Sequence, residues 1–383
     1  MGGSEGTGVG GFRIARIEAA AYRVPADPPV RTAFGTMHDR PGVVVRVEDG
    51  EGNHGWGEIF CNWPPPGAEH RARLVRDVLA PLATGRDFDH PSQPGAWLEQ
   101  RTRVLVLQCD EPGPFAQAIA GIDGACWDLA ARRAGLPLAV ALGGAVRPVP
   151  AYASGINPDR PERMAAAKRA EGYGGFKLKV GFGRDRDVDN LAAMRAELGP
   201  DARLMADANQ AWSLEETRAM LPELARFALH WLEEPVMADT PLEAWRTLGA
   251  AAPMRLAAGE NMRSRSEFSA AIASGAFGVV QPDAIKWGGV TGCAAVGREI
   301  VAAGLDYCPH FLSGGIGLMA SAHILAAVGG PGMLEVDGNE NQLRTFLAQP
   351  FPALADGFFR LTDAPGIGVE PDLARLEAAR RPL

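Results

Sequence analysis

The sequence predicts an α/β protein in which a small α+β unit precedes a parallel barrel of strands and helices. Two observations lead to this fold class. The first third of the 383-residue chain mixes strand-like alternation with long helical repeats, whereas the part after Gly143 and Gly144 alternates short apolar runs with amphipathic segments rich in Ala and Arg. Eight such runs span about 190 residues, and eight parallel strands with helical crossovers close into a barrel.

The N-terminal α+β unit is expected to contain an antiparallel sheet and three helices. Alternation of apolar and polar residues predicts strands at Phe12–Pro25, Val43–Glu48 and His54–Phe60, and the turn sequence DGEGN separates the last two. Apolar residues at three- and four-residue intervals then predict helices. These helical segments are Glu69–Ala83, Trp97–Val106 and Phe115–Arg133.

The second part of the chain is expected to supply one barrel strand per apolar run. Each run is short and is followed by an amphipathic helix, which is the pattern of a βα unit. The tail sequence DGFFRLTDAPGIGVEP is typical of extended chain that returns to the N-terminal unit. The eight predicted strands are Pro148–Ser154, Gly175–Val180, Ala202–Asp207, Leu229–Glu234, Met254–Glu260, Phe277–Asp283, Gly304–His310 and Gly332–Asp337.

Composition and charge indicate a soluble protein with a small-molecule partner. Charged residues make up 22% of the chain and apolar residues 46%, which excludes intrinsic disorder. The net charge is −8, and the sequence contains no long run of residues of one charge. Neither nucleic acid nor a membrane surface is therefore an expected partner. No apolar run is long enough for a membrane span, and the first eleven residues lack the features of a signal peptide. Five cysteines without a CxxC pair indicate reduced thiols, so we expect a cytoplasmic protein.

Polar residues follow the predicted barrel strands at regular spacing. Successive members of this set lie 23 to 28 residues apart, which is one per βα unit. Because the carboxyl ends of barrel strands meet at one mouth, these groups are expected to face a common pocket. They are Lys179, Asp207, Glu233, Glu260, Asp283, His310 and Glu335.

Three of these residues predict a metal site. Asp207, Glu233 and Glu260 end successive strands and supply only oxygen ligands, which Mg²⁺ prefers. Any one of them alone could instead cap a helix or pair with an arginine. The three together, beside a pair of lysines, favour one Mg²⁺ ion per chain.

Two acid/base groups are predicted beside the metal site. Lys177 and Lys179 lie two residues apart on one strand, so both side chains are expected to face the barrel interior. A like charge and a metal ion both lower the pKa of a lysine, so Lys179 is expected to act as a base near neutral pH. At the ends of the sixth and seventh strands, Asp283 is expected to hydrogen-bond one ring nitrogen of His310 and raise the basicity of the other.

These motifs resemble the enolase superfamily, and within it the mandelate racemase subgroup. The resemblance covers nearly the whole chain, including a lead-in to the barrel at Gly121–Gly144. A lysine at the position of Asp283 would indicate the muconate-cycloisomerase or dipeptide-epimerase type, and Lys286 is not at that place. The motifs that carry the resemblance are FKLKVG at Phe176–Gly181, DAN at Asp207–Asn209, LEEP at Leu232–Pro235, AGEN at Ala258–Asn261, QPD at Gln281–Asp283, GGVT at Gly288–Thr291, PH at Pro309–His310 and LE at Leu334–Glu335.

The resemblance implies a modified TIM barrel, (β/α)₇β, with an α+β capping domain. The capping domain is expected to combine residues 1–132 with a C-terminal segment, 340–383, and the catalytic barrel to take residues 133–339. Substrate choice in this family lies in loops of the capping domain, which here are Pro28–Pro41 and Phe60–His70.

The resemblance also implies a mechanism. The metal ion binds the substrate carboxylate, the proton on the α-carbon is removed, and the ion together with Lys177 and Glu335 stabilises the enediolate. Lys179 and the His310/Asp283 dyad are expected on opposite faces of the substrate.

Two reactions remain open from the sequence. The first is a dehydratase that converts a hydroxy acid or acid sugar into a 2-keto acid, with His310 as the general acid for the β-hydroxyl. The second is a racemase or epimerase of a 2-hydroxy acid, which would use the same residues. A Schiff-base aldolase on Lys179 would not need three carboxylates, and a binding protein would not bury them without a metal. We expect a homo-oligomer.

The resemblance also implies roles for the LEEP motif, and the loops near the site offer candidate substrate contacts. In LEEP the first acidic residue, Glu233, takes the ligand role, and Glu234 is expected to face the other way. The loop SGGIG at Ser313–Gly317 is expected to approach the substrate through its backbone rather than to bind phosphate. Cationic, aromatic and amide side chains are candidate substrate contacts, although the cations and aromatics could equally be loop packing: Arg31, Arg40, Phe34, Trp63 and Asn209.

Overall fold

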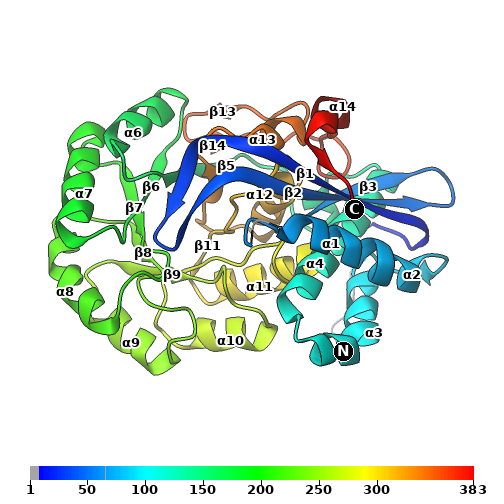
Figure 1. Cartoon of the computed structure of the whole chain (residues 1–383), viewed down its shortest axis with the longest axis horizontal. Coiled ribbons are helices and arrows are strands. Elements are labelled where there is room, and N and C mark those ends of the chain that lie inside the picture. The colour runs from blue at the N-terminus through cyan, green and yellow to red at the C-terminus, as the bar shows by residue number, and fades with distance from the viewer. Residues whose placement is uncertain (1–7, 65) are drawn as a thin grey trace.

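The computed structural model describes residues 8–64 and 66–383, so seven of the eleven N-terminal residues discussed above lie outside it. An antiparallel sheet and its helices lie beside a ring of strands surrounded by helices, and the C-terminal segment returns to the first sheet (Figure 1). Within the described ranges, no helix combines the length and apolar character needed to cross a bilayer.

The N-terminal unit, defined as β1 to α4, has the predicted strands and helices. β1 (Phe12–Thr32) pairs antiparallel with β2 (Gly35–Asp49), and β2 pairs with β3 (His54–Ile59). The helices are α1 (Gly67–Leu74), α2 (Ala80–Ala83), α3 (Gln93–Cys109) and α4 (Pro112–Arg133), with a π-helical segment, Val75–Leu79, between the first two.

The prediction of a loop at Pro28–Pro41 is wrong. Strand pairing resumes after an irregularity that follows Pro25, and Val30 faces Met37 while Thr32 faces Gly35. The segment is therefore the far end of the β1–β2 hairpin, which extends over the barrel (Figure 1). Its backbone groups pair with each other, which gives the segment a fixed shape.

Glycines allow α4 to lie directly on β3. A Cβ at Gly57 would stand 1.9 Å from the carbonyl oxygen of Gly121, and one at Gly55 would stand 2.2 Å from that of Ala125. No larger residue fits at such a distance, so the helix and the strand are held at one fixed separation. At Gly55 and Gly57 of the sequence GWGE, the strand therefore meets the helix without a side chain between them.

The barrel is defined as the strands β5 to β12 with their helices, and all eight predicted strands are confirmed. Neighbouring strands from β5 to β11 pair in parallel and in sequence order, and β12 pairs with β5. The strands are β5 (Val149–Ile156), β6 (Gly175–Lys179), β7 (Arg203–Asp207), β8 (Trp231–Glu233), β9 (Arg255–Ala258), β10 (Val279–Val280), β11 (Asp306–Tyr307) and β12 (Leu334–Asp337).

One barrel helix, α8 (Leu214–Ala225), begins at a local start signal in the sequence. At the start of α8, Ser213 and Glu216 each accept a hydrogen bond from the other's backbone N–H, which is a capping box. The helices are α5 (Leu138–Ala141), α6 (Pro161–Ala170), α7 (Arg184–Leu198), α8 (Leu214–Ala225), α9 (Leu242–Ala251), α10 (Arg265–Ala273), α11 (Gly289–Ala302) and α12 (Gly315–Val328).

A layer of interior side chains fills the barrel below its mouth. The backbone N–H of Met333 donates to Cys308 Sγ at 3.3 Å, which connects the two ends of the strand order. A Cβ at Gly175 would stand 3.0 Å from Met333 Cε and from Tyr152 Cβ, so β6 adds no side chain to this layer. The layer consists of Tyr152, Met205, Trp231, Ala257, Val279, Cys308 and Met333.

The C-terminal segment contacts both parts of the molecule. β14 (Phe358–Phe359) pairs with β5 and with β13 (Leu354–Ala355), and β15 (Arg380–Arg381) pairs antiparallel with β1. The end of this segment therefore lies against the N-terminal unit, and its middle part lies against the barrel. The remaining elements of this segment are the short helices α13 (Gln342–Phe346) and α14 (Leu373–Leu376).

Candidate active site

Lysines and carboxylates pair inside the barrel at the carboxyl ends of β6, β7 and β8. Lys177 Nζ lies 2.5 Å from Glu233 Oε1 and 2.7 Å from Glu335 Oε1, and Lys179 Nζ lies 2.5 Å from Asp207 Oδ2. The strand register places these residues at the same level along the barrel axis. Lys179 pairs across the strands with Asp207, and Asp207 pairs with Glu233. Both lysines are buried, as alternation along one strand predicts.

The predicted histidine dyad is present at the ends of the sixth and seventh strands. His310 Nδ1 lies 2.7 Å from Asp283 Oδ2, and His310 Nε2 lies 2.6 Å from Glu260 Oε2. The backbone N–H of Ile285 donates to the second oxygen of Asp283. The imidazole is therefore held between two carboxylates and is 5% exposed.

The lysine cluster and the histidine dyad are on different sides of the barrel. β7, β8, β9 and β10 lie between β6, which carries Lys179, and β11, which precedes His310. Glu335 bridges the remaining gap, because its second oxygen accepts the backbone N–H of Phe311 at 2.8 Å. We call the Lys177, Lys179 and Asp207 group the lysine side, and the Asp283 and His310 pair the histidine side.

The pKa of Lys179 differs from its expected direction. Burial is the largest influence and lowers this pKa, as does the neighbouring Lys177, but the carboxylates of Asp207, Glu233 and Glu260 together raise it above its usual value. For Asp207, burial would raise the pKa, but the two lysines hold it below its usual range. The like charge of Lys177 alone therefore does not lower the pKa of Lys179 beside these carboxylates, and the effect of a metal ion on this pKa stays a prediction.

The pKa of His310 is raised. Burial alone would lower it, but Glu260 and Glu335 favour the imidazolium and the hydrogen bond to Asp283 adds to this effect. A histidine in this setting carries a proton that it can donate, which is the state that a general acid requires.

The carboxylates fit the donor set of a hard divalent cation. Asp207, Glu233 and Glu260 offer only oxygen, and the buried Oδ1 of Asn209 has no hydrogen-bond partner among the described residues. Within those residues, no three His, Cys, Asp or Glu side chains already form a metal cage. Each carboxylate is instead turned to a cation, Lys179, Lys177 or His310 respectively. The ligand set remains a prediction.

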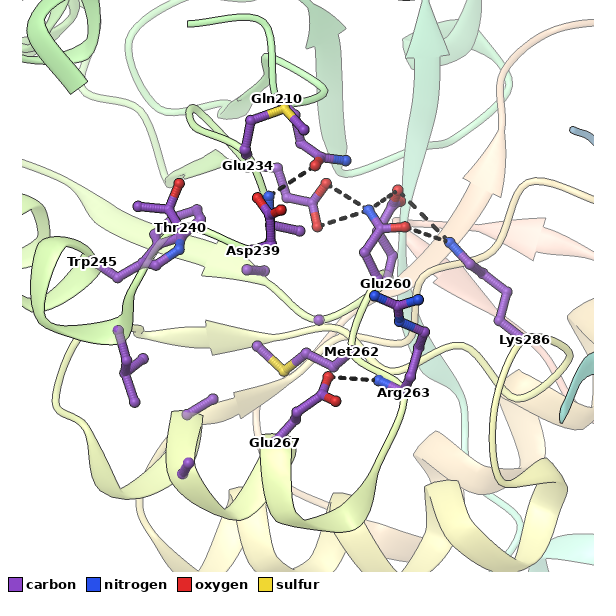
Figure 2. A pocket seen from close by; sticks show the side chains of 18 of the residues that line it. Gln210, Glu234, Asp239, Thr240, Trp245, Glu260, Met262, Arg263, Glu267 and Lys286 are labelled. Carbon is purple, nitrogen blue, oxygen red and sulfur yellow. Dashed lines mark hydrogen bonds and ion pairs between the residues drawn. The ribbon is translucent and has the colours of Figure 1, made fainter. Parts of the chain in front are cut away.

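Glu234 was not chosen from the sequence and lies beside Glu260. Glu233 points into the barrel, whereas Glu234 accepts two hydrogen bonds from Asn261 Nδ2 at the edge of a cavity of about 770 Å³. Figure 2 shows Glu234, Glu260 and Lys286 converging at one end of this cavity, away from Trp245. The two glutamates of LEEP thus face different directions, but Glu234 stays near the site.

Lys286 is a second residue that sequence reasoning set aside. Its Nζ lies 3.2 Å from Asn261 Oδ1 and 3.9 Å from Glu260 Oε1, and it lies over the ring of Phe60. The Asn of AGEN joins it to Glu234 through Nδ2. This partly buried network holds Glu260 in place, and the proximity of the LEEP and AGEN motifs is the sequence signal that could have revealed it.

The candidate substrate contacts separate into two groups. Phe34 and Trp63 meet at the hairpin end with ring centroids 5.3 Å apart, and Phe34 is 59% exposed. Arg31 instead pairs with Asp159 at 2.8 Å. Asn209 lies in the site, where its backbone N–H donates to Asp207.

The expectation that Arg40 contacts the substrate is wrong, whereas that for the SGGIG loop stays a prediction, although two of its amides have a partner within the protein. Arg40 is 2% exposed and forms an ion pair with Asp337 in the barrel, so its guanidinium is not available to a substrate. The amides of Gly314 and Gly317 in the SGGIG loop donate to Glu58, at 2.5 and 2.9 Å. The loop backbone is therefore occupied by a carboxylate of the N-terminal unit.

Comparison with known protein families assigns both parts of the chain. Residues 15–143 match the family described as mandelate racemase / muconate lactonizing enzyme, N-terminal domain. Residues 160–375 match the family described as enolase C-terminal domain-like. Together these matches cover most of the described residues.

Relatives and solved structures of similar length also match. A D-galactarolactone cycloisomerase of Agrobacterium fabrum is 31% identical over 97% of this chain and 100% of the relative, and an arabinonate dehydratase of Saccharolobus solfataricus is 26% identical over 86% and 88%. A structure from Bordetella bronchiseptica RB50, described as a mandelate racemase/muconate lactonizing enzyme, has a TM-score of 0.90 and 53% identity, covering 96% of this chain and 99% of its own. A racemase of Streptomyces coelicolor A3(2) with bound magnesium has a TM-score of 0.85 and 28% identity, covering 96% and 100%.

Proposed function

The chain belongs to the enolase superfamily, in the mandelate racemase subgroup, and from this premise we propose that it eliminates a β-oxygen from a sugar acid. The reaction is of the enolase type, in which the proton α to a carboxylate leaves and an enediolate forms. The finer proposal is that a carbon–oxygen bond at the neighbouring carbon then breaks, giving a 2-keto acid.

One observation carries this proposal: the site has an acid/base group on each side of the barrel mouth. Lys179 stands on the lysine side and His310 on the histidine side, with four strands between β6 and β11. Elimination needs a base for the α-proton and an acid for the departing oxygen. With two separate groups, one can remove the α-proton while the other protonates the departing oxygen.

Mg²⁺ is the cofactor, and Asp207, Glu233 and Glu260 are the residues that would hold it. When bound, the ion supplies positive charge that stabilises the substrate carboxylate and the enediolate. Lys177 presents a second positive charge inside the barrel, and Glu335 holds it there. Fixed charges of this kind stabilise a developing anion without having to reorganise.

The proton transfers follow from the remaining residues. Lys179 takes the α-proton, and the electron pair forms a carbon–carbon double bond as the β-carbon loses its oxygen. His310, positioned by Asp283, gives a proton to that oxygen. The resulting enol takes up a proton at the β-carbon and becomes the 2-keto acid. An open-chain substrate releases water, whereas a substrate whose β-oxygen is part of a ring keeps it as a new hydroxyl.

The comparisons favour elimination over racemisation. Relatives that match the chain along most of its length include a cycloisomerase and a dehydratase of sugar acids, and both names describe loss of an oxygen substituent or its rearrangement. Racemisation remains the second candidate, because solved relatives include a racemase and the same two acid/base groups would serve it.

The test is incubation with Mg²⁺ in D₂O of a panel of sugar acids, together with anhydro sugars and lactones that keep a free carboxylate. Mass spectrometry then separates the outcomes. A 2-keto acid from an open-chain acid identifies a dehydratase, the same product from a cyclic substrate identifies a cycloisomerase, and deuterium at the α-carbon without keto acid identifies a racemase. A wild-type enzyme that exchanges no α-proton in the whole panel would contradict the proposal.

Variants of the two acid/base groups assign the roles. His310→Asn should lower turnover by about 100-fold or more, since general acid catalysis contributes about 10²–10⁴-fold, yet it should keep α-proton exchange by Lys179. Lys179→Ala should lose that exchange. If both variants exchange the α-proton of the same stereoisomer, the assignment to opposite faces is wrong.

A further inference from the structure

Two buried carboxylates of the N-terminal unit reach into the barrel. Glu58 comes from β3 and Asp123 from α4, and they are 2% and 3% exposed. Neither has an ion-pair partner among the described residues, and neither faces the lysine side. Each accepts hydrogen bonds at the start of a barrel helix, and the two helices are those that follow β10 and β11.

Glu58 binds the start of α12. Its Oε1 accepts the backbone N–H of Gly314 and its Oε2 that of Gly317, at 2.5 and 2.9 Å. These amides belong to the loop and first turn that come directly after His310. A Cβ at Gly314 would stand 2.6 Å from Glu58 Oε1, so the glycine is what lets the carboxylate approach. The first N–H groups of a helix have no partner within the helix, and a carboxylate there also complements the helix dipole.

Asp123 binds the start of α11 in the same way. Its Oδ1 accepts the backbone N–H of Thr291 at 3.0 Å, and its Oδ2 accepts the Thr291 hydroxyl at 2.6 Å. This helix follows the loop that begins at Asp283. Gly289 has a φ of 60°, and a Cβ there would stand 2.2 Å from Asp123 Oδ1, so the Gly-Gly pair of GGVT serves this contact.

Two more contacts hold the same loops from the same side. The backbone N–H of Phe60 donates to the carbonyl oxygen of Ile285 at 3.1 Å, two residues after Asp283. Asn62 Nδ2 donates to the carbonyl oxygen of Leu312 at 2.9 Å, two residues after His310. Both loops of the histidine side are therefore fixed to the N-terminal unit twice.

The lysine side is held differently. The loop after Lys179 is bound by Asp187, whose oxygens accept the backbone N–H groups of Gly181 and Phe182 at 2.8 and 3.2 Å. Asp187 lies on α7, which is a barrel helix. The barrel itself thus supplies the carboxylate on this side, and Lys179 is held by Asp207 on the adjacent strand.

From this difference we infer that Glu58 and Asp123 are positioning residues for the His310/Asp283 dyad. The N-terminal unit supplies the hydrogen bonds that hold the histidine side, whereas Asp187 of the barrel supplies those that hold the loop after Lys179, where the hairpin end adds an apolar contact between Ala33 and Gly181. This inference rests on the proposed function only in giving the two sides separate proton transfers.

The inference predicts that substitution of Glu58 or Asp123 slows proton transfer by His310 but not by Lys179. Glu58→Gln and Asp123→Asn keep the shape of each side chain but replace one accepting oxygen with a donating NH₂ group that faces backbone N–H groups. A displacement of about 1 Å at a reacting group can cost about 100-fold in rate. We expect proton transfer by His310 to fall by about 10- to 100-fold in each variant, and α-proton exchange by Lys179 to stay within about threefold of wild type.

The experiment measures both sides in each protein. Stereospecific exchange of the α-proton in D₂O reports the lysine side, and keto acid formation or exchange of the opposite stereoisomer reports the histidine side. Asp187→Asn is the matched control, because it removes the same kind of contact from the lysine side and should show the reverse pattern. Thr291→Val removes the hydroxyl contact of Asp123, together with the hydrogen bond that this hydroxyl accepts from Trp127, without changing a charge, so it tests the contact of the N-terminal unit with α11 if Asp123→Asn does not fold.

A second measurement does not depend on activity. With histidine labelled by ¹⁵N, the ring proton between His310 and Asp283 gives a downfield NMR signal that His310→Asn identifies. This signal should shift or broaden in Glu58→Gln and Asp123→Asn and stay unchanged in Asp187→Asn. If the wild-type enzyme exchanges no α-proton, the proposed function fails and the NMR result alone decides the inference. Equal losses on both sides in Glu58→Gln, or an unchanged histidine signal in both variants, would overturn it.

Discussion

Replacing Glu58 by glutamine should change how the free energy of unfolding depends on pH. Burial raises the pKa of Glu58 from 4.5 to about 7; the nearby Asp283 adds to this rise, and the amides of Gly314 and Gly317 oppose it. Between these two pH values the folded protein keeps a proton on Glu58 that the unfolded chain has released. The raised pKa of Glu58 therefore stabilises the folded protein fully below about pH 4.5. This stabilisation is lost progressively as the pH rises from 4.5 through about 7.

The size of the effect follows from the two pKa values. One pKa unit corresponds to about 1.4 kcal/mol, so a rise from 4.5 to about 7 is worth about 3 kcal/mol, most of it lost between pH 5 and pH 8. Asp123 titrates in the same range, because burial raises its pKa from 3.8 to about 7. It is present in both proteins, so the difference between wild type and Glu58→Gln isolates the contribution of Glu58.

Urea denaturation at pH 5, 6, 7 and 8 measures this difference. The free energy of unfolding of the wild type, minus that of Glu58→Gln, should fall by about 2.5 kcal/mol between pH 5 and pH 8. Glu215→Gln, at an exposed position on α8, serves as the control and should give a difference that does not change with pH. A constant difference for Glu58→Gln would show that the buried carboxylate is already ionised at pH 5, and the reasoning from burial would be refuted.

Three further predictions follow from the site and the contact between the two units. Mg²⁺ at 100 times its Kd should stabilise the protein by about 2.7 kcal/mol in thermal shift, and Asp207→Asn should abolish that gain; an unchanged gain would contradict the ligand assignment. Arg40→Leu leaves Asp337 buried without its cation and should cost about 3–5 kcal/mol in denaturation, much of it recovered when Asp337→Leu is added; additive losses would argue against the pair. Gly289→Ala combines a positive φ with a close contact, so it should cost at least about 2 kcal/mol, and a neutral result would refute the packing argument.

Much of the barrel and its site could be predicted because the information is local. A strand and its helix form one repeat of the sequence, so Asp207 and Glu233 fall at equivalent positions and become neighbours once the strands pair in parallel. Alternation along β6 likewise places Lys177 and Lys179 on one face. These inferences need only the period of each element and the rule that strand ends meet at one mouth.

The contacts between the two units could not be predicted in this way. Glu58 is the third residue of the sequence WGEIF at Trp56–Phe60, and nothing near it in the sequence indicates that its partner is an amide 256 residues away. Arg40 presents the same difficulty. From the sequence, an arginine in the hairpin could bind a substrate, and only the structure shows that it pairs with Asp337 of the barrel. The direction of the Lys179 pKa also depended on distance, since the carboxylate in contact outweighs the neighbouring ammonium.

The same unit that holds the histidine side also carries Phe34 and Trp63, the aromatic pair at the hairpin end. Any change in the orientation of the N-terminal unit therefore moves the candidate substrate contacts and the His310/Asp283 dyad together, while Lys179 stays with the barrel. A substrate whose distal part repositions this unit would alter proton transfer on the histidine side before it alters removal of the α-proton. Under the proposed function, substrate recognition and departure of the β-oxygen would then be linked through the N-terminal unit, and formation of the enediolate on the lysine side would depend less on either.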